Sequence, residues 1–179
     1  MEIKHYYRIM PGAKSVFASE CFGEGFIGGD WGFDTDLTGK LPENWREFNK
    51  TFIPVFLAKN PGKSRVAAGL ACGMLHAICK GMKIGDVVIS PDGTGNYRIG
   101  EVTSEYFWQP GKILPHRRAV HWHQHMIQRE DMTQELKNSS GSIGTVSNLT
   151  KYSEEFKQLV TVHGFRLAVP WRREFCIVL

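Results

Sequence analysis

The sequence predicts an α+β fold with a β-rich core and three or four helices. Short runs of β-branched and aromatic residues recur along the chain and end at glycine, proline or asparagine, as strands do. Two longer segments have apolar residues at helical spacing. The 179 residues are 42% hydrophobic and 22% charged, enough for one buried core. We therefore expect one domain over residues 1–160 and a C-terminal tail of unknown role over residues 161–179.

The N-terminal part of the chain contains two predicted strands. Residues 5–10 are aromatic and β-branched and stop at Pro11-Gly12, which predicts a strand followed by a turn. Residues 26–33 predict a second strand. Glycines within a strand mark a bulge or a close approach to the backbone, and this one contains three, at positions 28, 29 and 32.

Two helices are predicted in the middle of the chain. Aromatic residues at positions 45, 48, 52 and 56 indicate an amphipathic helix from Pro42, which we expect Pro54 to break. The run 64–80 predicts a longer helix that ends at Gly81. Its expected apolar face consists of Val66, Ala67, Leu70, Ala71, Met74, Leu75 and Ile78.

The second half of the chain alternates between strands and turns. Residues 87–90 and 97–102 predict two antiparallel strands, because the dense turn signal at 91–96 would join them in a hairpin. A further strand is expected over 118–126 and a Gly/Ser loop over 139–144. Helices are expected near 131–138 and 152–160.

Composition excludes several classes of protein. No stretch reaches the length of an apolar membrane helix and the first residues lack a signal peptide, so we expect a soluble, cytoplasmic protein. No CxxC pair is present, so a zinc ribbon or a disulfide framework is not expected. No cofactor is expected either. The free thiols should be buried; they are Cys21, Cys72, Cys79 and Cys176.

The charge of the chain is unevenly distributed. The formal net charge is +4, with 12 basic and 12 acidic residues in 1–110 but 10 and 6 in 111–179. The segment 110–129 has no acidic residue and contains Lys112, His116, Arg117, Arg118 and Arg129. This local basic field suits a polyanion, although a solvated basic strand would have the same composition.

Motifs for catalysis are absent. The chain has no GxSxG, HExxH or P-loop motif and no GxGxxG motif at a strand-to-helix turn, so we expect a binding protein and not an enzyme. The triplet Glu2-Ile3-Lys4 matches part of a nuclease motif only superficially. His121, His123 and His125 would share one face of a strand, but residues two apart are about 6.6 Å apart, which is awkward for a single metal ion.

Aromatic and basic residues alternate in a way that suits nucleic acid. Trp31 and Phe33 lie in the glycine-rich strand, and Tyr106, Phe107 and Trp108 precede the two arginines. Exposed aromatic rings stack on bases and arginines bind phosphates. Three successive aromatic residues cannot all face inward from a strand, so at least one should be exposed or line a pocket. The alternative is that these rings simply form the core.

Several of these segments resemble a known family. The run 82–88, then 97–102 and an aromatic loop, is similar to the central signature of EVE domains in the PUA-like superfamily. Gly100-Glu101-Val102 with Tyr106, followed by 114–122 (LPHRRAVHW), resembles the N-terminal reader module of Mrr-like, modification-dependent restriction proteins. Segments 144–146 and 152–155 also fit this module, so the resemblance covers residues 5–160.

The resemblance implies a PUA-like, EVE-like fold, which is a curved, β-barrel-like sheet flanked by helices. It also implies a pocket for a modified base flipped from DNA, with N6-methyladenine slightly favoured over a modified cytosine. The pocket residues would be Asp30, Trp31, Phe33, Ser90, Tyr106, Phe107 and Trp108, and the phosphate ligands would be Lys112, His116, Arg117 and Arg118.

Restriction proteins with this module carry a separate nuclease or motor domain, and no such domain is recognisable here, so the resemblance implies a partner that cleaves. Three alternatives remain open. PUA-like folds also bind RNA, the apolar segment 171–179 could dock another protein, and the three histidines could hold a metal ion.

Overall fold

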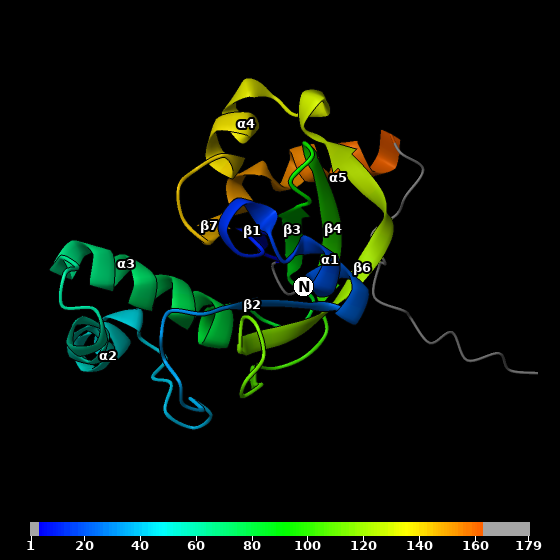
Figure 1. Cartoon of the computed structure of the whole chain (residues 1–179). Coiled ribbons are helices and arrows are strands. Elements are labelled where there is room, and N and C mark those ends of the chain that lie inside the picture. The colour runs from blue at the N-terminus through cyan, green and yellow to red at the C-terminus, as the bar shows by residue number, and fades with distance from the viewer. Residues whose placement is uncertain (1–3, 163–179) are drawn as a thin grey trace, which may run out of the picture.

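A strongly curled, half-barrel sheet forms the centre of the protein, with helices around it (Figure 1). The computed structural model describes residues 4–162. The predicted α+β class and curved sheet are confirmed. The strands are β1 (Tyr6–Ile9), β2 (Phe26–Gly29), β3 (Val87–Pro91), β4 (Asn96–Val102), β5 (Phe107–Trp108), β6 (His116–Gln128) and β7 (Val146–Asn148). The α-helices are α1 (Ala18–Glu24), α2 (Trp45–Lys59), α3 (Arg65–His76), α4 (Gln134–Ser140) and α5 (Ser153–Val162).

The long strand β6 holds the two parts of the sheet together. The strands run in the order β2-β6-β4-β3-β1-β7, and β5 pairs with β6 beside this path. The first residues of β6 lie between β2 and β5, whereas its second half pairs with β4. The predicted β3–β4 hairpin is antiparallel as expected, while β1 and β3 are parallel.

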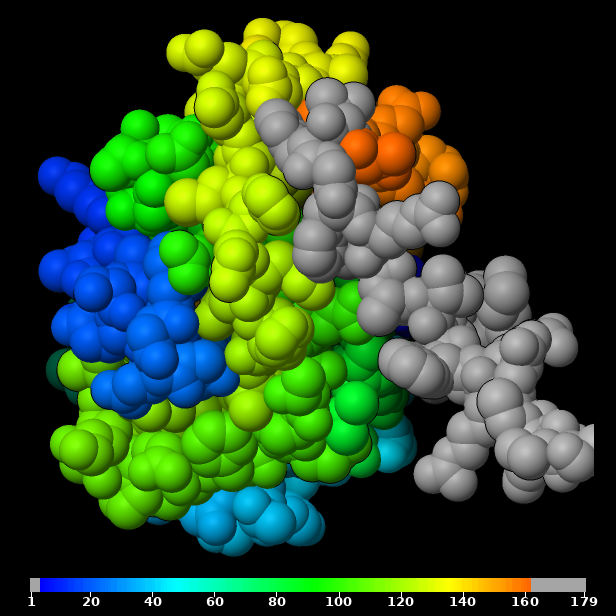
Figure 2. All heavy atoms as spheres, turned by 90° about the vertical axis from the view of Figure 1, so that its right-hand side faces the viewer, coloured from blue at the N-terminus to red at the C-terminus, as the bar shows by residue number. Residues whose placement is uncertain are grey.

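Two of the apolar cores involve the longer helices. Beside α4 and α5, buried residues of β1, β3 and β4 pack on the helices, and the ring of Tyr6 stacks on Phe156 at 5.5 Å between ring centroids. A second core lies between α2 and α3, where the rings of Phe48 and Phe52 stack at 4.2 Å. On the surface shown in Figure 2, the blue helix α1 lies beside the yellow-green strand β6, and the Trp122 indole N–H donates to the Cys21 carbonyl oxygen.

The α2–α3 hairpin, residues 44–81, extends away from the sheet (Figure 1). Pro54 lies inside α2, so the expectation that it breaks the helix is wrong. Pro54 is on the exposed side of α2, where water can satisfy the backbone carbonyl that proline leaves without a donor. A π-helical turn, Ala77–Gly81, follows α3 and ends the hairpin at the predicted glycine.

The buried face of α3 differs from the predicted one. Val66 is 74% exposed and Leu70 is 64% exposed, whereas Ala68 and Cys72 are fully buried. The small residues face α2 because two helices approach closely only where side chains are short. The apolar pattern predicted the helix correctly but could not identify the side that meets a neighbour.

Two further departures concern strands. β2 ends at Gly29, four residues before the predicted end, because the Asp30 carboxylate accepts a hydrogen bond from the Gly32 N–H at 2.9 Å and turns the chain. In β6, four residue steps between Trp122 and Met126 oppose two steps in β4, which is a bulge. The short elements α1, β5 and β7 were not predicted, since each is too short to show a periodic pattern.

The expectations about membrane helices and cysteines can also be compared with the structure. No helix in the described part of the chain is long and apolar enough to cross a membrane. Cys21, Cys72 and Cys79 are buried free thiols, as predicted. Cys176, the tail from residue 163 onward, and the first two residues of the Glu2-Ile3-Lys4 triplet lie outside the described residues.

Candidate functional site

A row of aromatic side chains crosses the sheet where β2, β6 and β5 meet. In this row Gly29 pairs with His116, and His116 pairs with Trp108 on its other side. Directly paired residues in a sheet point to the same face. The His116 and Trp108 rings accordingly lie together, with their centroids 4.7 Å apart.

Trp31 completes this row from the loop after β2. A Cβ atom placed on Gly29 would lie 2.1 Å from two carbons of the Trp31 six-membered ring. The indole therefore occupies the space that a side chain at position 29 would need, on the same face as His116 and Trp108. We call Trp31, Tyr106, Trp108 and His116 the aromatic site.

His116 is fully buried and both of its ring nitrogens are hydrogen-bonded. Its Nε2 lies 2.8 Å from the Phe33 carbonyl oxygen, which can only accept, so Nε2 carries the proton. Nδ1 must then accept from the Tyr106 hydroxyl at 3.0 Å, and the Leu37 N–H donates to that hydroxyl oxygen at 3.2 Å. Burial lowers the pKa of His116 and raises the pKa of Tyr106 to about 12. The pair is neutral at physiological pH, and it fastens loop 30–42 to the sheet.

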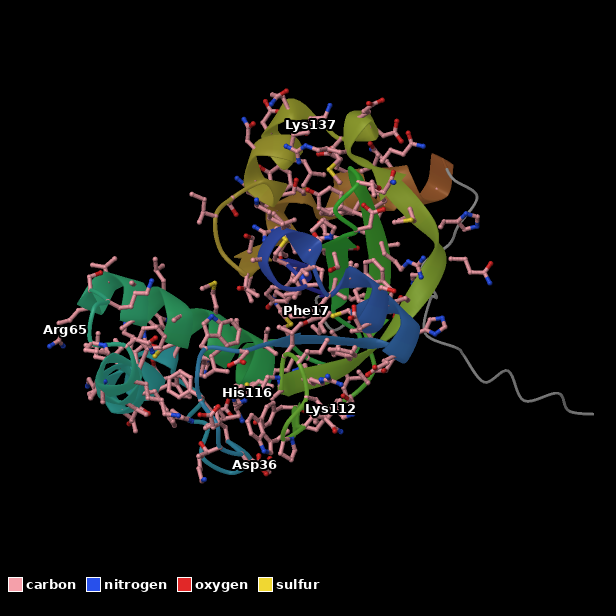
Figure 3. The ribbon with its side chains drawn as sticks, in the orientation of Figure 1. Phe17, Asp36, Arg65, Lys112, His116 and Lys137 are labelled. Carbon is pink, nitrogen blue, oxygen red and sulfur yellow. The ribbon has the colours of Figure 1, made fainter. Side chains whose placement is uncertain are left out.

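Three carboxylates surround this aromatic site. Asp30, Asp34 and Asp36 are exposed in the loop. Their negative charges raise the pKa of His116 and so oppose the larger effect of burial, which lowers it. Lys59 of α2 pairs with Asp34 at 2.9 Å. The backbone and side chain of Thr38 donate to Asp36 and lower the pKa of that carboxyl group. In Figure 3, Asp36 lies at the same end of the molecule as His116 and Lys112.

Phe107 and Arg117 lie on the opposite face of the sheet from Trp108 and His116, because they occupy the next register position. Arg117 is buried, with its guanidinium 3.6 Å from the centroid of the Phe26 ring. It donates to the Leu114 and Ile113 carbonyl oxygens. Consecutive aromatic residues thus face opposite sides of the sheet, as expected, and Phe107 does not belong to the aromatic site.

Arg118 is the more deeply buried of the two arginines predicted as phosphate ligands. Its guanidinium donates to three backbone carbonyl oxygens, and it is 1% exposed. Burial lowers its pKa. Arg117, Arg118 and His116 are buried and their polar atoms have partners within the protein, so the structure does not place them on the surface where a phosphate would bind. Lys112 is exposed, as that role requires.

Two predicted pocket residues lie elsewhere. Phe33 is buried in the α2–α3 core, 5.8 Å from the Phe52 ring, and only its carbonyl takes part in the site. Ser90 is buried in β3 and donates to the Ile9 carbonyl oxygen. Its register row crosses β6 at Met126, ten residues from His116, or roughly 30 Å along the strand. Asp30, Trp31, Tyr106 and Trp108 are the predicted pocket residues that the structure brings together.

The predicted histidine cluster has a different geometry. The β6 bulge leaves His123 buried and His121 exposed, with ring centroids 5.4 Å apart. Over residues 4–162, no group of three His, Cys, Asp or Glu side chains is placed to hold a metal ion.

Two components of the site were not among its predicted residues, although a close approach to the backbone was one expectation for the glycines of the β2 segment. Gly29 provides the space for the Trp31 ring, and its signal was the glycine pair that precedes Asp30. Leu37 is a long way from Tyr106 in sequence, and no local pattern indicates their contact. A separate polar hollow of about 340 Å³ lies at the far end of β6, next to Arg129 and Lys137.

Residues 7–150 match the family model described as a domain of unknown function, DUF8426. This match covers most of the chain, so the protein belongs to the DUF8426 family. A comparison with curated proteins gave no match. The matched range includes the whole aromatic site and the α2–α3 hairpin.

Proposed function

We propose that this protein binds DNA carrying a modified base and holds the flipped base at the aromatic site. The observation that carries the proposal is the row of Trp31, His116 and Trp108 on one face of the sheet, where Trp31 folds over Gly29. Trp31 and Trp108 are partly exposed, so they can offer ring surface to a ligand. His116 is neutral and internally bonded, so it supports the two indoles from behind.

In this proposal, stacking on the two indoles offsets the free energy needed to flip the base out of the duplex. Extrusion of a base costs a few kcal/mol, and each base–aromatic stack returns roughly 1–3 kcal/mol. Two partly exposed indoles can therefore offset the cost of flipping. The Asp30 carboxylate is an acceptor next to this ring surface, which suits the exocyclic amino group of adenine or cytosine. N6-methyladenine is slightly favoured over a modified cytosine.

In this proposal the chain is a reader and not a nuclease. Its role is the specificity module of a modification-dependent, type IV-like restriction and phage-defence system in the cytoplasm. A nuclease or motor domain or subunit would supply the cleavage. No cofactor is required, because stacking and hydrogen bonding are sufficient for recognition.

Fluorescence anisotropy tests this proposal with one duplex in four forms: unmodified, with N6-methyladenine, with 5-methylcytosine and with 5-hydroxymethylcytosine. Two salt concentrations are needed because phosphate contacts weaken with salt, whereas stacking does so much less. A preference of tenfold or more for one modification that persists at high salt supports the proposal. Equal affinities that vanish with salt contradict it, and tighter binding to a matched RNA would instead identify an RNA-binding module.

A further inference from the structure

The α2–α3 hairpin carries most of the net charge of the protein. Residues 44–81 include six basic residues and one acidic residue. Taking these from the 22 basic and 18 acidic residues of the chain leaves 16 and 17, which nearly cancel. The C-terminal third, which the sequence favoured as the basic region, contributes less surface charge than expected because Arg117 and Arg118 are buried.

Four of the six basic side chains face solvent without a carboxylate partner among the described residues. Lys59 pairs with Asp34 and Lys80 pairs with Glu43. The remaining four are exposed and lie in α2, in the turn between the helices and at the start of α3. These four residues, Arg46, Lys50, Lys63 and Arg65, are called the basic arm below.

The hairpin that carries the basic arm contacts the loop that follows β2, which also contains Trp31. The Lys59 ammonium also donates to the Gly32 carbonyl oxygen at 2.7 Å, and the Phe33 ring packs between Phe52 and Phe56. Arg65 lies at the far end of the hairpin, as Figure 3 shows. The 12 residues of α3 span about 18 Å, which is the length of about five base pairs of B-DNA.

The carboxylates around the aromatic site require phosphates to be bound elsewhere. Asp30, Asp34 and Asp36 repel a phosphate but leave a neutral base free to approach the indoles. With the two central arginines buried, Lys112 is the one predicted phosphate ligand that is still exposed, so a nucleic acid needs further cationic residues near this site. The basic arm is such a surface.

We infer that the basic arm binds the phosphate backbone of the nucleic acid whose base occupies the aromatic site. This inference rests on the proposed function and extends it. The chemistry divides into two separate tasks: the arm supplies affinity that is independent of base modification, and the aromatic site supplies the preference for a modified base.

The experiment compares two double variants with the full-length protein. Lys63→Gln with Arg65→Gln removes two charges from the arm, and Lys14→Gln with Lys151→Gln removes two exposed charges outside it as a matched control. Binding to the unmodified and modified duplexes is measured by anisotropy over a range of salt concentrations. Each lost phosphate contact should make the negative slope of log K against log salt shallower by about 0.9.

The arm variant should bind both duplexes at least about tenfold more weakly at 0.1 M salt and keep the wild-type ratio between them. The control variant should bind as the wild type does. An arm variant with unchanged affinity and salt slope overturns the inference. If the wild type shows no preference for a modified base but the arm variant still binds DNA more weakly, the proposed function is refuted while phosphate binding by the basic arm is supported.

A binding assay with anionic vesicles distinguishes a membrane from a nucleic acid as the partner. Val66 and Leu70 are exposed beside the arm, and an apolar and basic surface also suits a lipid headgroup layer. Vesicles of phosphatidylserine and phosphatidylcholine should not bind the wild type at physiological salt. Binding to vesicles that depends on Lys63 and Arg65, without binding to DNA, overturns the inference.

Discussion

Trp31 lies over Gly29 so closely that no other residue at position 29 leaves the indole in place, since a Cβ atom there would be 2.1 Å from the ring. The glycine and the tryptophan act as one unit. Gly29 has no side chain at the end of the edge strand β2, and the ring of the tryptophan two residues later fills that space. As a result the aromatic site extends across β2, although β2 contributes no aromatic side chain to that face.

Gly29→Ala should lower the free energy of unfolding by about 1–3 kcal/mol, because the added methyl group displaces the indole. Combining it with Trp31→Ala should remove this cost, since the ring that it strikes is gone. Urea denaturation of the two single variants and the double variant measures this coupling. Gly62→Ala is the control, because nothing lies within 4 Å of a Cβ at that exposed position. Additive effects at positions 29 and 31 would contradict the contact.

Trp31→Ala should weaken binding to modified DNA more than binding to unmodified DNA, because it removes one of the two partly exposed indoles of the site. Anisotropy with both duplexes measures the difference. Phe22→Ala is a suitable control, since Phe22 is also a partly buried aromatic residue but packs on Trp122 outside the site. Equal losses for both duplexes would exclude Trp31 as a pocket wall.

The stability of the protein should depend on His116 in mildly acidic solution. Burial lowers the pKa of His116 in the folded state, while the unfolded chain takes up a proton near pH 6.5. The unfolded state therefore binds more protons, and the free energy of unfolding falls as the pH drops below about 6.5. The stability that this group contributes is fully present above that pH and is lost as the pH approaches the folded-state pKa.

His116→Gln should lack this part of the pH dependence, which urea denaturation at pH values from 5 to 8 can measure. Burial also lowers the pKa of His123, but that residue titrates in both proteins and cancels in the difference. Parallel stability profiles for the wild type and the variant would show that the pKa of His116 is not lowered in the folded state.

Arg118→Lys should lower the free energy of unfolding by about 2 kcal/mol or more. An ammonium group keeps the charge but cannot reproduce the three hydrogen bonds to the Ile78, Cys79 and Ser104 carbonyl oxygens. Lys112→Gln should leave stability within about 0.5 kcal/mol, because Lys112 is exposed. Urea denaturation compares the two variants. Wild-type stability in Arg118→Lys would restore Arg118 as a candidate for phosphate binding.

Three of the four thiols should be unreactive in the native protein. Burial raises the pKa of Cys21 to about 12 and of Cys72 to about 11, and it also raises the pKa of Cys79. Only the thiolate attacks a disulfide reagent. Labelling at pH 8, followed by mass spectrometry, should find these three modified only after denaturation. Rapid native labelling of any of them would show that the helices around it open.

The local pattern of the sequence predicted much of the secondary structure. The β3–β4 hairpin follows from two β-branched runs separated by a dense turn, and α3 follows from its helical periodicity and Gly81. Such features depend on neighbouring residues only, so the sequence determines them. The alternation of Phe107 and Trp108 between the two faces of the sheet was predictable for the same reason.

Tertiary structure decided which of the candidate residues form a site. The sequence does not show which basic and aromatic residues are buried and which are exposed. Only the packed fold places the Arg118 guanidinium among carbonyl oxygens and leaves Arg65 in solvent. The contact between Leu37 and Tyr106 spans 69 residues, and that between Phe33 and His116 spans 83. The sequence alone determined the kinds of side chain that are available. The pairing of distant strands decided which of them meet, because register between strands is set by the folding of the whole chain.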